Sequence, residues 1–148
     1  MRESLSKTVQ EIVRSANKTA RQFNKDYVGT EHLLLAIAEQ SDTTGAGILE
    51  EHGVTPAKLR KQIDKLAKAS MEDTWVFGRL PGTPHFKNVV ARAIEQARQY
   101  ETSIICTQHI LLGLLMEKGS IAQLALEKVG VTIKSVKKLK ELMSKTEE

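Results

Sequence analysis

His32, His109 and Cys106 are side chains whose types could bind a metal ion or act as a nucleophile. Cys106 and His109 have a C-x-x-H spacing, but no second ligand pair accompanies them, and a structural zinc ion normally takes four protein ligands. A catalytic cysteine would need a neighbouring base, which no pattern here specifies. The sequence therefore predicts no metal site and no catalytic residue. Both histidines are interpreted as structural, each tying its helix to a neighbouring backbone carbonyl.

Nucleotide chemistry is not expected either. The sequence has no G-x-x-x-x-G-K-[ST] loop, whose backbone N–H groups and lysine would hold the phosphates of a nucleotide. We therefore predict that the chain is not an enzyme and carries no cofactor.

The two histidines belong to a long internal repeat. Residues 6–66 and 83–143 are related without a gap by an offset of 77 positions, as between His32 and His109. Other matches are Val13 with Val90, Ala16 with Ala93, 20–22 with 97–99, Thr30 with Thr107, 34–35 with 111–112 and 53–55 with 130–132. A repeat with constant spacing through helices and turns indicates duplicated units that bury their apolar faces together.

Each copy of the repeat predicts four helices. The first has an apolar stripe at helical spacing, formed by Val9, Ile12, Val13, Ala16, Ala20 and Phe23 and repeated at Phe86, Val89, Val90, Ala93, Ala97 and Tyr100. Thr83 and Pro84 are typical of a helix start in the second copy. The second helices follow Thr30 and Thr107, whose hydroxyls can cap the first turn, and are apolar on most sides, so they should be central.

The third and fourth helices are bounded by glycines and threonines. We expect third helices at about 44–52 and 120–129, ended by Gly53 and Gly130 in the left-handed conformation. Fourth helices should begin at 55–56 and 132–133 and reach about 68 and 145. The predicted fold is all-α, a pseudo-twofold bundle of two four-helix repeats with about eight helices.

At 148 residues the chain has the length of one domain, so the repeats are interpreted as two halves of a single domain spanning 1–148. Repeat one covers about 4–69, a linker about 70–82, and repeat two about 83–146. The linker contains Trp75 and Phe77. These aromatic side chains either pack on the seam between the repeats or form an exposed contact for a partner protein.

Composition is typical of a soluble globular protein, with 41% hydrophobic and 27% charged residues. No apolar run approaches the roughly 20 residues that span a bilayer, and the N-terminus does not resemble a signal peptide, so a cytoplasmic protein without membrane contact is expected. The pI near 9.2 leaves a nucleic-acid-binding protein as a remote alternative, but the basic residues are dispersed and few aromatic residues accompany them.

One stretch has the features of a known family. Residues 27–37, Tyr-Val-Gly-Thr-Glu-His-Leu-Leu-Leu-Ala-Ile, together with 48–49 and 53–54, resemble the Clp repeat of bacterial and plastid ClpA- and ClpC-type unfoldases. The second copy, 105–115 with 130–131, resembles it too. In that family the double repeat is the mobile N-terminal domain of a hexameric ATPase, where it docks adaptor proteins and receives substrate proteins.

The resemblance also implies a ligand. ClpC-type repeats carry a pocket for phosphorylated arginine, in which a hydroxyl and helix N–H groups suit the phosphate and a carboxylate suits the guanidinium. Carried over to this chain, the hydroxyls fall on Ser6 and Thr83, the acidic position on Glu31 and its counterpart on Gln108, with Thr30 and Thr107 beside them. Gln108 lacks the charge, so Glu31 with Ser6 is predicted to be the stronger half-site.

Two forms of this function remain open at the level of sequence. The first is a module that docks adaptors and protein substrates for Clp ATPase and protease components, in cis or in trans. The second is a stand-alone accessory subunit that regulates the Clp protease or unfoldase. In both forms neither nucleic acid nor a membrane is expected as a partner.

Overall fold

The computed structural model describes residues 4–22, 28–69 and 84–146, and they form an all-α fold, as predicted. Repeat one contains β1 (Ser4–Leu5), α1 (Lys7–Gln22), α2 (Thr30–Glu39), α3 (Thr44–Glu51) and α4 (Pro56–Ala69). Repeat two contains α6 (Pro84–Gln99), β2 (Ile104–Ile105), α7 (Thr107–Met116), α8 (Ile121–Lys128), the 3-10 helix η1 (Ile133–Ser135) and α9 (Leu139–Met143). The predicted linker, with Trp75 and Phe77, lies outside the described residues, as does Thr83.

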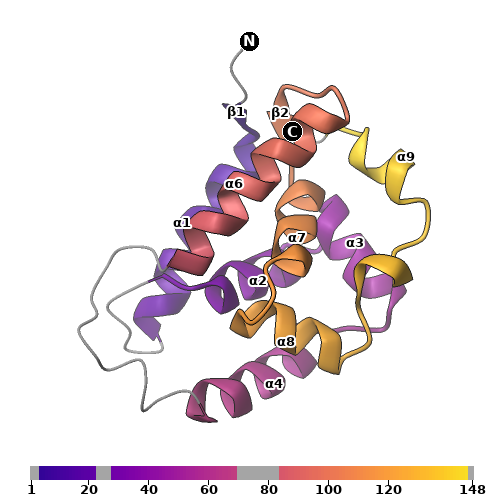
Figure 1. Cartoon of the computed structure of the whole chain (residues 1–148). Helices are drawn as coiled ribbons and strands as arrows, with labels where there is room; N and C mark the ends of the chain where they lie inside the picture. Colours follow the sequence, from indigo (N-terminus) through magenta and orange to yellow (C-terminus); the bar gives the residue numbers. More distant parts are fainter. Residues whose placement is uncertain (1–3, 23–27, 70–83, 147–148) are drawn as a thin grey trace.

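The central position predicted for the second helices is confirmed. Every residue of α2 from Thr30 to Ile37 and of α7 from Thr107 to Leu115 is buried. The apolar stripe of α1 packs on α2, that of α6 packs on α7, and α2 also contacts α7 (Figure 1). The two central helices therefore form the common core of both repeats.

The repeats exchange contacts rather than standing side by side. Helix α4 of repeat one packs along α8 of repeat two, and α3 packs against α7. The short strands β1 and β2 pair in parallel, with Ser4 opposite Ile104 and Leu5 opposite Ile105. Each repeat thus completes the burial of the other, which is the physical basis of a single core.

The ends predicted for the third helices are also confirmed. Thr43 and Ser120 are the N-caps of α3 and α8, and each hydroxyl oxygen accepts a hydrogen bond from the third residue of its helix. Gly53 and Gly130 follow these helices with φ of 71° and 87°. Because an L side chain rarely adopts that conformation, glycine stops the helix here at little steric cost.

The prediction of a continuous fourth helix in repeat two is wrong. Thr132 and Ser135 close the short turn η1 by capping each other, Val136 is extended, and Lys138 has a φ of 55° before α9 begins. His52, the residue after α3, contributes, because its Nε2 lies 2.9 Å from Ser135 Oγ. These contacts fix a break where the pattern of repeat one predicted a helix.

Among the described residues, no single helix is long and apolar enough to cross a membrane, although α7 and α8 pass that test together as a pair bent by 92°.

Candidate ligand-binding site

The first turns of α2 and α7 are held by the repeated histidines. Nδ1 of His32 accepts a hydrogen bond from the N–H of Gly29, and Nδ1 of His109 accepts one from the N–H of Cys106, both at 2.9 Å. Nε2 of His109 lies 2.8 Å from the backbone oxygen of Met143, to which it donates. The structural interpretation of His109, as a link from its helix to a neighbouring carbonyl, is therefore confirmed.

Thr30 and Thr107 do not cap their own helices, contrary to the prediction. Gly29 and Cys106 occupy the N-cap positions. The Thr107 hydroxyl instead accepts from the N–H of Gly45 in α3 at 2.8 Å, and the Thr30 hydroxyl accepts from the N–H of Ala122 in α8 at 3.2 Å. Each threonine thus satisfies an N-terminal amide of the third helix in the opposite repeat, a partner that helical periodicity within one repeat does not reveal.

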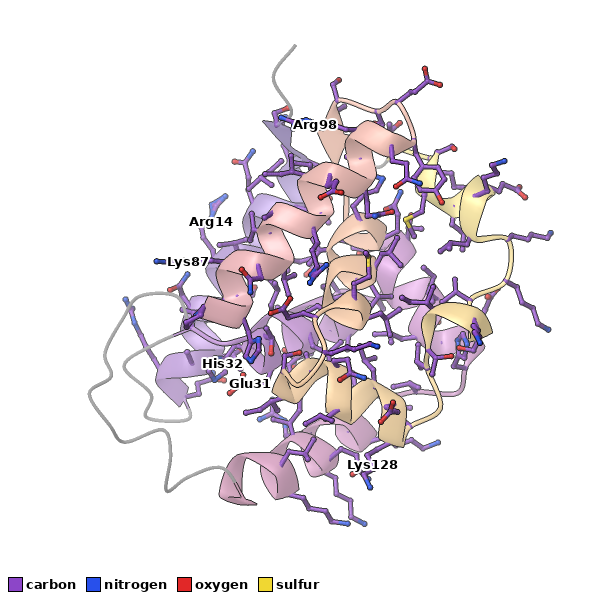
Figure 2. All side chains as sticks on the ribbon, viewed as in Figure 1. Arg14, Glu31, His32, Lys87, Arg98 and Lys128 are labelled. Carbon is purple, nitrogen blue, oxygen red and sulfur yellow. The ribbon has the colours of Figure 1, made fainter. Side chains whose placement is uncertain are left out.

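Glu31 is a buried acid in the first turn of α2, with 5% of its surface exposed. Its carboxylate turns back over Gly29. A Cβ atom built on Gly29 would lie 3.0 Å from the Glu31 carboxyl carbon and closer still to Oε1. Figure 2 shows Glu31 below the start of α6, and α2 contacts α6. A negative charge in the first turn of α2 lies near the N-terminal end of that helix, whose dipole favours it.

Gln108, the counterpart of Glu31, is fully buried and has a different role. Its Nε2 donates to the backbone oxygens of Leu142 and Lys145, at 3.1 and 2.8 Å. With His109 it fastens the C-terminal segment to the first turn of α7. We call these contacts the C-terminal clasp. The Oε1 atom of Gln108 has no hydrogen-bond partner among the described residues, so the side chain is placed by its two donated bonds.

Ser6 does not lie with Glu31. Its hydroxyl caps α1 by accepting from the N–H of Val9 at 3.0 Å, and its own N–H donates to the oxygen of Ile105, just before α7. The structure therefore places Ser6 at the β1–β2 end of the molecule, whereas Glu31 lies toward the other end of α1 (Figures 1 and 2). Membership of one repeat suggested the pairing, but the exchanged packing separates the two residues.

An ion cluster around the buried Glu117, formed with residues of α6, was not predicted from the sequence. Oε2 of Glu117, at the end of α7, accepts from Asn88 Nδ2 at 2.8 Å and lies 2.7 Å from His85 Nδ1, while Oε1 accepts from Arg92 Nε at 2.9 Å. Burial by itself raises the pKa of Glu117, but these hydrogen bonds and the Arg92 charge outweigh it and lower the pKa to about 2. The signal for this cluster was a disagreement between the copies, because Gln40 is the counterpart of Glu117.

An open cleft of about 280 Å³ lies between α8 and η1. Ile133 lines this cleft. Among the described residues it is the one large hydrophobic side chain that is exposed, with 39% of its surface accessible. Among the same residues, no group of three or more His, Cys, Asp or Glu side chains is arranged to hold a metal ion.

The fold and these helix starts define a double-repeat, all-α domain, and comparison with known proteins identifies its family. The family model of the Clp repeat (R) N-terminal domain matches residues 4–93 and 81–148. The chain therefore belongs to the Clp repeat N-terminal domain family.

Among curated relatives, the chain is 31% identical over 118 residues to the ATP-dependent Clp protease ATP-binding subunit ClpC of Staphylococcus saprophyticus, a match covering 80% of this chain. It is 30% identical over 139 residues, 94% of this chain, to the ATP-dependent Clp protease ATP-binding subunit ClpA homolog of Trieres chinensis. These matches cover 14% and 16% of the two relatives' own lengths.

Solved structures agree on the fold. The N-terminal domain of the ClpD chaperone from Arabidopsis thaliana is similar with a TM-score of 0.64 and 22% identity, over 95% of this chain and 92% of that one. A structure from preliminary structural investigations of a malarial protein secretion system gives a TM-score of 0.73 at 21% identity, over 96% of both chains.

Proposed function

We propose that this chain is a protein-binding module of the Clp unfoldase and protease system, which docks adaptor proteins and substrate proteins. Family membership supports this function, because the curated relatives are ATP-binding subunits of an ATP-dependent Clp protease. On this proposal the ATPase and protease components act on what the module holds, either in the same chain or in a partner. The cleft lined by Ile133 offers apolar surface for such docking.

The ligand we assign to the start of α2 is phosphoarginine on a substrate protein. The observation that carries this assignment is the Glu31 carboxylate, which is buried in the first turn of α2, a helix that contacts α6. A carboxylate there suits a guanidinium, and the N-terminus of the 16-residue helix α6 suits a phosphate. Gln108 is neutral and engaged in the C-terminal clasp, so we expect one binding site per chain rather than two.

Calorimetric titration of phosphoarginine tests the ligand. We expect saturable binding by the wild type with a stoichiometry near one. Glu31→Gln should weaken binding about tenfold or more, because it removes the charge-assisted part of the contact. Glu39→Gln is the matched control, since this acid lies at the exposed end of the same helix and pairs with Arg60. An absence of saturable binding by the wild type would contradict the assignment.

Docking of whole proteins requires a second comparison. An arginine-phosphorylated unfolded protein should bind more tightly than the unmodified protein, and Glu31→Gln should remove the difference. Equal binding of both forms would support docking without phosphoarginine recognition. Binding of neither form would contradict substrate docking by this chain.

A further inference from the structure

The N-cap residues of α2 and α7 have the same backbone conformation but different side chains. Gly29 has φ −106° and ψ 176°, and Cys106 has φ −108° and ψ 175°. These angles lie in the extended region that any residue adopts. The backbone conformation at position 29 therefore does not require glycine. The reason for a glycine at this position must lie in the atoms around it.

The space that a side chain at position 29 would occupy is filled by the Glu31 carboxylate. A Cβ atom built there would lie 3.0 Å from the carboxyl carbon of Glu31 and 3.2 Å from Oε2, with Oε1 closer still. Contacts this short displace one of the two groups, and the end of a glutamate side chain moves more readily than a helix N-terminus. A side chain at position 29 would therefore push the carboxylate away without unfolding the helix.

Repeat two has the alternative arrangement. Cys106 has a Cβ atom at the equivalent point and is fully buried. The side chain of Gln108 is directed to the backbone oxygens of Leu142 and Lys145. The pairs Gly29 with Glu31 and Cys106 with Gln108 are thus two consistent solutions at one backbone position.

We propose that Gly29 is a positioning residue that determines which repeat binds a cationic ligand group. The missing side chain leaves room for the Glu31 carboxylate to lie across the start of α2, where it meets the guanidinium of phosphoarginine. Cys106 fills that room in repeat two and commits Gln108 to the C-terminal clasp. The choice of ligand rests on the function proposed above, whereas the placement of the carboxylate by Gly29 does not.

The test compares Gly29→Ala with Cys106→Gly, the same position in the other repeat. The ¹³C resonance of the Glu31 carboxyl carbon, the affinity for phosphoarginine and the melting temperature are measured for both variants. For Gly29→Ala we expect a displaced Glu31 resonance, at least tenfold weaker binding and a melting temperature within about 3 °C of the wild type. Cys106→Gly should leave the Glu31 resonance and the affinity unchanged.

Two results would overturn the proposal. One is an unchanged Glu31 resonance and affinity in Gly29→Ala. The other is a loss of folded protein, or a large fall in melting temperature, in Gly29→Ala, since either would assign Gly29 a packing role. If the wild type binds no phosphoarginine, the ligand assignment fails on its own, and the Glu31 resonance still decides whether Gly29 places the carboxylate.

Discussion

The first turns of α2 and α7 share a backbone and a histidine hydrogen bond, yet residues 31 and 108 face different surroundings. In repeat one an acid turns back over a glycine at the start of α2. In repeat two an amide donates to two carbonyls of the C-terminal segment. Duplication therefore preserved the frame that holds both turns, while the second turn alone holds the C-terminal segment and the first carries the acid to which we assign a ligand.

Replacing the amide of the C-terminal clasp by an acid should have the largest effect. Gln108→Glu removes two N–H donors and places a negative charge against the oxygens of Leu142 and Lys145, at a position with no exposed surface. We expect a loss of about 3 kcal/mol in the free energy of unfolding, or roughly 10 °C in melting temperature. Thermal and denaturant unfolding measure it.

Two further variants sharpen this prediction. Gln123→Glu is the control, because its side-chain oxygen accepts from Gly119 at an exposed site and a carboxylate does the same. Adding Cys106→Gly to Gln108→Glu should recover part of the loss, since the carboxylate then has the room that Gly29 leaves for Glu31. A fully stable Gln108→Glu single variant would contradict the difference between the two turns.

The Glu117 cluster should give a smaller, pH-dependent effect. At neutral pH we expect Glu117→Gln to lose about 2 kcal/mol, because a neutral amide forms weaker contacts with Arg92, His85 and Asn88. The folded-state pKa of about 2 lies below the ordinary value of 4.5, so the unfolded state binds more protons between these values. The stabilisation by Glu117 is therefore present above about pH 4.5 and is lost as the pH falls toward 2.

Denaturant unfolding of the wild type and Glu117→Gln at several pH values from 7 to 3 measures this dependence. The difference in stability between the two proteins should shrink steadily below pH 4.5. Glu39→Gln, at the exposed ion pair with Arg60, should show almost no difference at any of these pH values. A constant difference for Glu117→Gln would mean that its charge is not what stabilises the fold.

The reciprocal threonine contacts should show where the two repeats behave alike. Thr30→Val and Thr107→Val keep the shape of the side chain but remove the acceptor for the amides of Ala122 and Gly45. Each should cost about 1 kcal/mol, or roughly 3 °C, in thermal unfolding. Replacement by serine retains the hydroxyl and should cost less in each repeat. If valine destabilised only one of the two repeats, the Thr30–Ala122 and Thr107–Gly45 contacts would not be equivalent.

Much of the fold followed from the sequence, because local rules govern it. The stripe through Val9, Ile12 and Ala16 predicted α1, and glycines at 53 and 130 predicted the ends of α3 and α8. The break before α9 was not predictable in this way. At this break Ser135 contacts His52, a residue far away in the chain.

Some features of the candidate site likewise followed from the sequence, and others from tertiary packing alone. The sequence by itself determined the duplicated frame, the histidines and the difference between Glu31 and Gln108, since residue types and spacing record these directly. Only the tertiary structure decided that Ser6 lies away from Glu31, that Thr30 and Thr107 serve the opposite repeats, and that Gln108 holds the C-terminal segment. The reason is that the repeats exchange contacts across one core, so the partner of a buried polar group is set by packing between copies.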